Sequence, residues 1–267
     1  MESTGERMVP GQSDPGTFWE HIFRYRFARS FVRRQRVLDI ACGEGYGSAA
    51  MLKAGAAAVI GVDISVESCK HARTKYGIET KVGSAEAIPL ADSSVDVVVS
   101  FETIEHVSRP ELFLDECVRV LRPGGLMIVS TPNRDAYRHG TPNNPFHCSE
   151  LSREEFAAMC EQRFKGTRYY SQRPSMASRW SPRGLAILAR GGGGRKARLG
   201  ALLRRWICTE LSEESTTYWG QHPVDAILSE APGWSSWINP FAIRELGSNG
   251  AELPIYILAV ARCSKER

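Results

Sequence analysis

The stretch VLDIACGEGYGS, residues 37–48, decides the fold of this 267-residue chain. An apolar run ends at Asp39 and Ile40, and glycines then stand at positions 43, 45 and 47. Glycines at alternating positions let the backbone turn tightly and approach a ligand closely. Twenty residues after Gly43 comes Asp63, where a carboxylate can accept both ribose hydroxyls of an adenosine. The pattern predicts a nucleoside site at the carboxyl edge of an open sheet.

The order of these glycines argues against a dinucleotide. The GxGxxG fingerprint would place its third glycine at position 48, but that residue is Ser48 and the glycine stands at 47. Asp39 flanks the turn, and its carboxylate would repel a pyrophosphate while suiting a sulfonium or an ammonium group. A nicotinamide-dependent enzyme is therefore disfavoured.

Short strand patterns alternate with helix patterns through the first half of the chain, which indicates βαβ units and a parallel sheet. Arg36–Ile40 reads as the first strand, and Val95–Phe101 is apolar on both faces, as a central parallel strand should be. Ser65 and Ser152 are expected to cap helices. Further strands are expected at 58–62, 78–82, 126–130, 167–171 and 255–261. The fold class is therefore α/β, with a doubly wound, mostly parallel, seven-stranded sheet and a late insertion.

The domain boundaries follow from this pattern. Residues 1–35 form an N-terminal helical segment or lid, in which the aromatic stretch around His21 and Tyr25 reads as a helix. Residues 36–172 form the core, and 173–250 an insertion that serves as a lid or substrate platform. Residues 251–267 supply the last strand and a tail.

The composition is that of an ordinary globular protein, with 42% hydrophobic and 24% charged residues. No run of eighteen apolar residues is present, and the polar, acidic N-terminus is unlike a secretory signal. The seven cysteines form no CxxC pair, which favours free thiols in a reducing compartment. A cytoplasmic location is expected.

Charge is unevenly distributed along the second half. Residues 162–209 contain twelve Lys or Arg and no acid, whereas 210–252 contain seven acids and one Arg. The Arg-rich stretch 163–205 could contact a membrane surface or a phosphate-bearing partner, or be an ordinary solvated face. RNA is the less favoured partner, because no RNA-binding module is recognisable.

Four blocks of sequence, taken in order, resemble class I S-adenosylmethionine (SAM)-dependent methyltransferases. The resemblance is to the bacterial type 11-like enzymes that act on small molecules and glycans, and it covers about a third of the chain. One departure is Ala41, which stands where many members have the first glycine of the loop. The blocks are VLDIACGEGYGS at 37–48, GVDIS at 61–65, GSAEAIPLADSSVDVVVSFETIEHV at 83–107 and RVLRPGGLMIVSTPN at 119–133.

The resemblance implies SAM as the cofactor and assigns roles to matching positions. Asp63 would bind the ribose, and Ile64 would pack against adenine. Ala85 and Glu86 would meet the adenine edge. The methionine part and the sulfonium would be lined by Asp39, Ala41, Gly43, Gly45, Phe101 and Glu102.

Two routes could activate a hydroxyl acceptor, which must lose a proton to a base or be bound by a metal. His106 and His147 are the candidate catalytic bases. Together with Glu102 and Glu105 they also form a candidate set of ligands for Mg²⁺, Mn²⁺ or Zn²⁺. The ExxEH pattern with a later His is similar to metal-assisted O-methyltransferases of ubiquinone biosynthesis and to RNA 3′-end 2′-O-methyltransferases.

The favoured interpretation is therefore an enzyme that transfers a methyl group from SAM to a hydroxyl oxygen of a small molecule, sugar or glycan. A metal-dependent RNA 2′-O-methyltransferase is one alternative. A binding protein that keeps the fold without catalysis is another.

Overall fold

The computed structural model describes residues 8–10, 13, 15–137, 145–172, 221–229, 243–246 and 256–265. The strands are β1 (Arg36–Ile40), β2 (Ala58–Asp63), β3 (Glu79–Val82), β4 (Val95–Phe101), β5 (Leu121–Pro132), β6 (Phe164–Gln172), β7 (Ile243–Glu245) and β8 (Tyr256–Cys263). The helices are α1 (Pro15–Ala28), α2 (Tyr46–Lys53), α3 (Val66–Tyr76), α4 (Pro110–Val120), α5 (Arg134–Tyr137), α6 (Arg153–Glu161) and α11 (Pro223–Leu228), with 3₁₀ turns η1 (Arg29–Phe31) and η2 (Ile104–His106).

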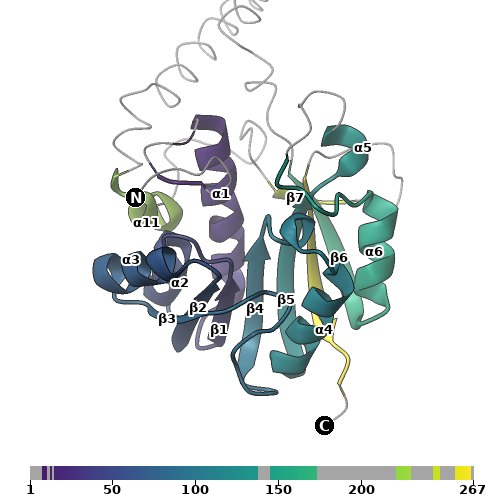
Figure 1. Ribbon diagram of the computed structural model, residues 1–267, viewed down its shortest axis with the longest axis horizontal. Coiled ribbons are helices and arrows are strands. Elements are labelled where there is room, and N and C mark those ends of the chain that lie inside the picture. The colour runs from purple at the N-terminus through teal and green to yellow at the C-terminus, as the bar shows by residue number, and fades with distance from the viewer. Residues whose placement is uncertain are drawn as a thin grey trace, which may run out of the picture.

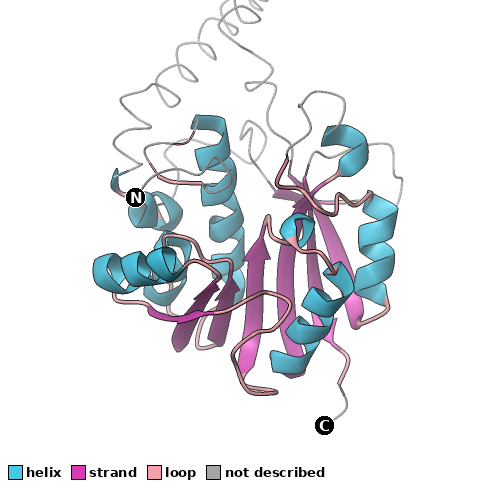
Figure 2. Cartoon of the chain, in the orientation of Figure 1, coloured by secondary structure: helices cyan, strands magenta, loops and turns pink. Residues whose placement is uncertain are grey.

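The described strands form one twisted sheet in the order β3-β2-β1-β4-β5-β8-β6-β7 (Figure 1). The first five strands pair in parallel, and β8 runs antiparallel between β5 and β6. Helices lie on both faces of the sheet (Figure 2). The predicted doubly wound, mostly parallel class is confirmed.

Two details differ from the prediction. β5 begins at Leu121 instead of 126, because Leu121 pairs with Val95 and a register shift follows before the regular ladder resumes. Gly124, with φ of +76°, permits the irregular turn inside this strand. The sheet also has an eighth strand, since the three residues of β7 pair with the end of β6. The insertion thus contributes one edge of the sheet.

Both predicted helix caps are confirmed. The Ser65 hydroxyl accepts a hydrogen bond from the Ser68 amide at 3.2 Å. Ser152 forms a capping box with Glu155: its hydroxyl accepts from the Glu155 amide at 3.2 Å, and the Glu155 carboxylate accepts from the Ser152 amide at 2.7 Å. Each cap satisfies amides that a helix start leaves unpaired.

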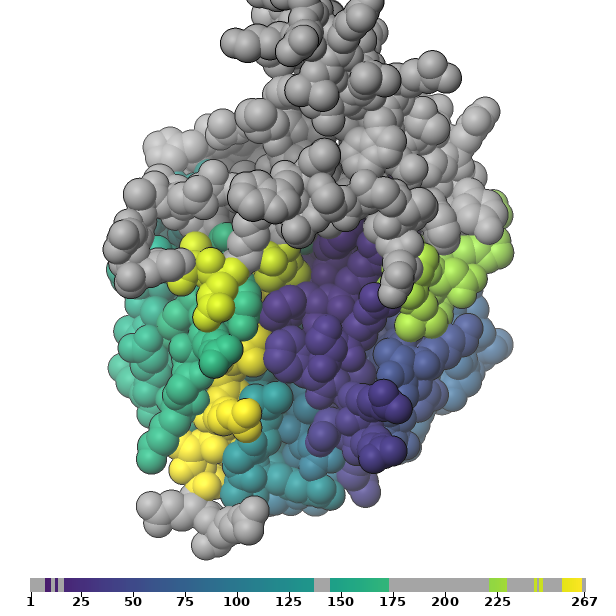
Figure 3. Space-filling model, turned by 180° about the vertical axis from the view of Figure 1, so that it is seen from behind, coloured from purple at the N-terminus to yellow at the C-terminus, as the bar shows by residue number. Residues whose placement is uncertain are grey.

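Two apolar cores, one on each face, hold the sheet between its helices. α1, α2 and α11 pack on one face, through residues such as Phe18 and Ile22. α4 and α6 pack on the other, where Phe113 and Phe156 are fully buried. Burying an aromatic side chain of this size stabilises the fold by about 1.5–3 kcal/mol. Figure 3 shows the first face, with α1 in purple down its middle and α11 in light green beside it.

Two arginines, one in α1 and one in the η1 turn that follows it, anchor α11. Arg26 donates to the Ala226 carbonyl at 2.9 Å, and Arg29 donates to the carbonyls of Ile227 and Leu228, each at 2.8 Å. These are carbonyls at the C-terminal end of α11, where cations are favourable. The predicted role of residues 173–250 as a lid or platform stays a prediction, since most of this segment, including Gly191–Gly194, lies outside the described residues.

Within the described residues, none of the helices combines the length and the apolar character needed to span a bilayer.

Candidate functional site

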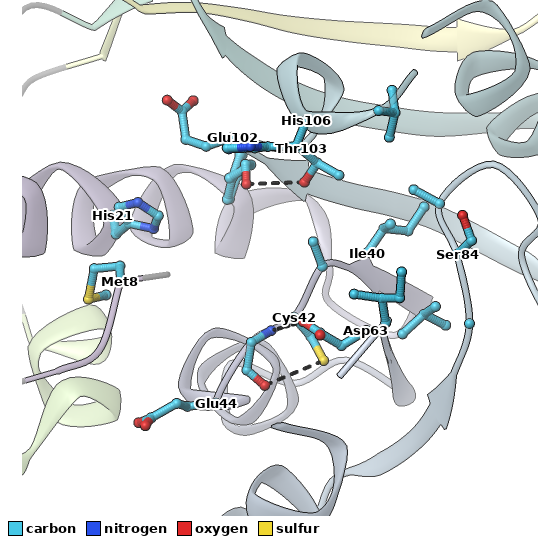
Figure 4. Close-up of a pocket in the computed structure, with 18 of the residues that line it drawn as sticks. Met8, His21, Ile40, Cys42, Glu44, Asp63, Ser84, Glu102, Thr103 and His106 are labelled. Atoms are coloured by element: carbon cyan, nitrogen blue, oxygen red, sulfur yellow. Dashed lines mark hydrogen bonds between the residues drawn. The ribbon is translucent and has the colours of Figure 1, made fainter. Parts of the chain in front are cut away.

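A cavity of about 680 Å³ opens at the carboxyl ends of β1, β2 and β4. From β1 the chain continues to β2 and β3 on one side of the sheet, and then returns to β4 and β5 on the other side. Open sheets bind ligands at such a topological switch point. Figure 4 shows Asp63 and Ser84 on one side of the cavity and Met8 and His21 on the other. The cavity therefore lies at the carboxyl edge of the sheet, where the sequence predicts a nucleoside site.

The loop between β1 and α2 forms the cavity floor and is held in an unusual backbone conformation. Ala41, Gly43 and Gly45 have φ values of +55°, +53° and +84°, in the left-handed region that glycine adopts most readily. A Cβ atom on Gly45 would lie 2.5 Å from Cβ of Ala72, so α3 also requires glycine there. Ala41 adopts a strained conformation at a position where glycine would relieve it.

Asp63 ties this loop to the start of α3. One of its carboxylate oxygens accepts a hydrogen bond from the Gly43 amide at 2.9 Å, and the other accepts from the Ser65 amide at 2.8 Å. The side chain lines the cavity although the residue is only 5% exposed. Each carboxylate oxygen has a further lone pair, so the group can still accept hydrogen bonds from a ligand diol.

The wall beyond Asp63 contains the residues predicted to surround adenine. Ile64, Ala85 and Glu86 all line the cavity, and Ile64 is 78% exposed there. An exposed aliphatic side chain beside a carboxylate suits the face of a purine. Glu86 is held in place because its Oε1 accepts a hydrogen bond from the Arg109 amide at 2.7 Å.

Asp39 was expected to line the ligand, but it lies behind the cavity wall. It is fully buried and is absent from the described cavity lining. Its carboxylate accepts hydrogen bonds from the Ser48 hydroxyl at 2.5 Å and from the Tyr25 hydroxyl at 3.3 Å, and Tyr25 lines the cavity in its place. Burial raises the pKa of Asp39 to about 7, against which the hydrogen bonds from Ser48 and Tyr25 act.

Phe101, the last residue of β4, and Glu102, which follows it, both line the cavity. Glu102 has φ of +52°, a strained value for a residue with a side chain. Its Oε1 accepts a hydrogen bond from the Ser130 hydroxyl at 2.7 Å, and its Oε2 lies 3.7 Å from a guanidinium nitrogen of Arg24. The carboxylate is thus held between β5 and α1.

Three of the four predicted metal ligands come together. Potential ligand atoms of Glu105, His106 and His147 all lie within 4.8 Å of one another. The loop that carries His147 returns to this point because the Cys148 and Ser149 amides donate to the Glu105 carbonyl, at 2.8 and 3.0 Å. Glu102 is not part of this group, because Ser130 and Arg24 hold its carboxylate elsewhere. The predicted four-residue metal site stays a prediction, of which three members are brought together here.

The chemistry of this group suits a divalent cation. Glu105 is 1% exposed, and its Oε1 has no hydrogen-bond partner within the described structure. Burial, and next the charge of Glu102, raise the pKa of Glu105 well above its usual range. His106 contacts the Phe146 carbonyl through Nδ1 at 3.0 Å, and His147 contacts Glu150 through Nδ1 at 3.1 Å. Metal-binding histidines are commonly oriented by such partners on their other nitrogen.

Residues 38–129 match the family model described as a methyltransferase domain. Over these residues the chain is similar to that family. The matched residues include the glycine loop, Asp63 and Glu102. The match ends within β5, so α1, the His147 loop and the insertion lie outside the matched residues.

Similar proteins carry related names. A "Probable S-adenosylmethionine-dependent methyltransferase" of Mycolicibacterium smegmatis is 42% identical over 164 residues, which cover 59% of this chain and 63% of that protein. A ubiquinone biosynthesis O-methyltransferase of Parvibaculum lavamentivorans is 41% identical over 109 residues, 39% of this chain and 43% of that protein. The chain therefore spans less than two thirds of the length of these relatives.

A solved structure agrees on the fold. A SAM-dependent methyltransferase from Thermotoga maritima superposes with a TM-score of 0.58 at 18% identity, covering 94% of this chain and 91% of the other. At that identity the likeness concerns the fold, and the Rossmann-like class I methyltransferase fold is confirmed.

The sequence did not assign a role to Arg24. This side chain is 1% exposed, and its guanidinium carbon lies 4.3 Å from the centre of the Tyr256 ring. The only signal was an arginine, three residues after His21, within an aromatic-rich stretch that also contains Arg26. Its partner Glu102 lies 78 residues further along the chain, and no local pattern links them.

Two further sets of predictions stay untested. Most of the Arg-rich segment 163–205 lies outside the described residues, so contact with a membrane surface, a phosphate-bearing partner or RNA stays a prediction. Among the described residues, the cavity is lined by His106 but not by His147. The role of either histidine as a base stays a prediction as well.

Proposed function

We propose that this chain is a SAM-dependent methyltransferase that methylates a hydroxyl oxygen of a small molecule or sugar. One observation carries the proposal. A single cavity runs from the Asp63 carboxylate, which can accept a diol, to Glu102 and His106 at the end of β4. A donor bound to Asp63 would therefore present its far end to a carboxylate and an imidazole.

The residues present fit SAM. Asp63 offers lone pairs to a ribose, and Ile64 offers an apolar face to adenine. The left-handed turn at Gly43 brings backbone rather than a side chain to the ligand, whereas Gly45 is outside the described cavity lining. When bound, SAM would supply a methyl group on a positively charged sulfur. The carboxylate of Glu102, held by Ser130 and Arg24, provides a negative charge at that end of the cavity.

The chain would contribute position, exclusion of water and removal of a proton. Holding the acceptor oxygen in line with the methyl group supplies most of the acceleration in such a displacement. The hydroxyl proton must leave as well, to a histidine of the cavity or through a metal that lowers the pKa of the hydroxyl. His106 is the cavity-lining member of the two predicted bases, and the ring of His147 packs against it with a centroid distance of 5.0 Å.

Metal assistance is the second route that we propose, on the grouping of Glu105, His106 and His147. Two imidazoles and one carboxylate suit Zn²⁺ or Mn²⁺ better than Mg²⁺, which prefers oxygen ligands. The buried Glu105 oxygen that lacks a hydrogen-bond partner in the described structure is the observation that supports this fit. In this case His106 would be a ligand and could not also serve as the base.

Hydroxyl oxygen is preferred as the acceptor on two grounds. The ubiquinone biosynthesis O-methyltransferases are 36–41% identical to this chain over 104–120 residues. The cavity also offers imidazole and carboxylate acceptors for a hydroxyl proton. The same carboxylates would also attract cationic amines. Matched amine acceptors are therefore the appropriate comparison in an assay.

Two measurements test the proposal. Calorimetry should detect binding of SAM and of S-adenosylhomocysteine to the folded protein. Formation of S-adenosylhomocysteine should then depend on a hydroxyl acceptor from a panel of catechols, phenols, sugars and polyols, and not on matched amines. Absence of binding would overturn the whole proposal, whereas binding with turnover of amines alone would overturn the choice of oxygen.

A further inference from the structure

α1 supplies one wall of the cavity through a single helical face. Thr17, His21 and Tyr25 all line the cavity, and they follow one another at intervals of four residues. Figure 4 shows the ring of His21 projecting from α1 into the cavity, on the side away from Asp63 and Ser84. His21 therefore faces the part of the cavity that a donor anchored on Asp63 would leave for an acceptor.

The imidazoles near the cavity differ in what already engages them. Nδ1 of His106 contacts the Phe146 carbonyl, and its Nε2 lies 4.0 Å from Oε1 of Glu105. His147 contacts Glu150 and is not among the described lining residues. No hydrogen bond to another described residue engages the ring of His21. Its nitrogens are therefore available to a ligand in the cavity.

The surroundings of His21 keep its ring uncharged. Burial, and next the positive charge of Arg24, lower the pKa of His21 well below its usual range. Arg24 is itself fixed beneath the site by Glu102 and by the Tyr256 ring. A neutral imidazole carries one donor nitrogen and one nitrogen with a lone pair. The lowered pKa favours this neutral form.

We propose that His21 is a catalytic residue of this chain, which binds the hydroxyl group of the acceptor and receives its proton. The inference rests on the proposed function and names the base that it requires. The acceptor oxygen gives an electron pair to the methyl carbon, and the electrons of the carbon–sulfur bond remain on sulfur. The proton of the hydroxyl group passes to the unprotonated ring nitrogen of His21.

This assignment also separates two tasks in the cavity. In this arrangement the group of Glu105, His106 and His147 would bind a cation, while His21 of α1 would receive the proton. The acceptor class that fits is a neutral molecule with a hydroxyl group, because Arg24 beside His21 disfavours an ammonium group in contact with this ring.

The test uses the full chain with two substitutions, His21→Ala and His21→Gln, and the control His222→Ala. His222 lies at the start of α11 and is outside the described cavity lining. Glutamine keeps a hydrogen-bonding side chain but cannot take up a proton. The acceptors are the neutral molecules catechol, methyl glucoside and glycerol, with S-adenosylhomocysteine formation as the readout.

Both His21 variants should keep the wild-type melting temperature and bind S-adenosylhomocysteine within about threefold, because the donor contacts are remote. Their kcat should fall by about 10²-fold or more, the usual contribution of a positioned base, with His222→Ala unaffected. Wild-type turnover by His21→Ala would overturn this inference alone. Turnover by His21→Gln with loss in His21→Ala would overturn proton transfer, since only orientation is then needed. A wild-type protein that binds the donor product but methylates no hydroxyl acceptor would overturn the proposed oxygen transfer and this inference together.

Discussion

The ring of Tyr25 on α1 occupies the space into which a Cβ atom on Gly47 would project. The same ring packs edge-on against Tyr46 and Phe101, with centroids 5.6 and 5.1 Å away, and its hydroxyl reaches Asp39. Gly47 lies inside α2 and has no left-handed backbone, so its lack of a side chain serves this contact. The last glycine of the loop is therefore required by the N-terminal helix.

Gly47→Ala should destabilise the protein by roughly 1–3 kcal/mol, because the added methyl group must displace a packed ring. In a helix a change from glycine to alanine normally stabilises by about 1 kcal/mol. A destabilising effect would therefore indicate the contact between Gly47 and the Tyr25 ring. Urea unfolding of wild type and variant measures it.

The matched backgrounds for that measurement are Tyr25→Phe and Tyr25→Ala. Phenylalanine keeps the ring, so the cost of Gly47→Ala should persist there. Alanine removes the ring, so the second change should cost nothing or stabilise. An equal cost in both backgrounds would contradict the assignment of Gly47 to Tyr25.

Asp63→Ala should weaken the binding of S-adenosylhomocysteine by roughly ten- to a hundredfold, the value of charged hydrogen bonds to a ligand. Asp63→Asn retains one acceptor oxygen, so its affinity for S-adenosylhomocysteine should lie between those of wild type and Asp63→Ala. Calorimetry measures the affinity, and the melting temperature must be followed because Asp63 also accepts from the Gly43 and Ser65 amides. Wild-type affinity in a folded Asp63→Ala protein would exclude the ribose assignment.

Much of the core could be predicted from the sequence because local chemistry specifies it. The end of β2 at Asp63 and the cap at Ser65 follow from apolar runs and from a side chain that satisfies helix amides nearby. The glycine spacing likewise predicted the tight turn at Gly43 and Gly45. These features depend on residues close together in the chain.

The parts that could not be predicted depend on distant residues or on one backbone angle. The left-handed φ of Glu102 turns its carboxylate toward Arg24 and Ser130, whereas regular spacing placed it with Glu105 and His106. Asp39 in β1 was expected to reach the ligand, but Tyr25 from α1 lies over it. Strand β7 has three residues, too few for any periodic signal.

Glu105→Gln and His147→Ala should each weaken Zn²⁺ or Mn²⁺ binding at least tenfold, because each removes a ligand from a three-residue group. Glu102→Gln should change metal affinity little, since Ser130 and Arg24 hold that side chain apart from the group. Titration calorimetry on the complex with S-adenosylhomocysteine measures the affinities. Loss of binding in Glu102→Gln would restore the four-ligand arrangement, and full turnover in the presence of a chelator would remove the metal from the reaction.

Asp39 should make the stability of the ligand-free protein depend on pH. Burial raises the pKa of this carboxyl from 3.8 to about 7, so the folded state binds its proton more tightly than the unfolded chain. The resulting contribution to stability is fully present below pH 3.8 and is lost as the pH rises through about 7. Asp39→Asn removes this titration while keeping an oxygen that can accept from Ser48. The melting temperature of the variant relative to wild type should therefore rise between pH 5 and pH 8. Parallel profiles for the two proteins would mean that Asp39 is ionised when buried, and that the hydrogen bonds from Ser48 and Tyr25 outweigh the loss of solvent.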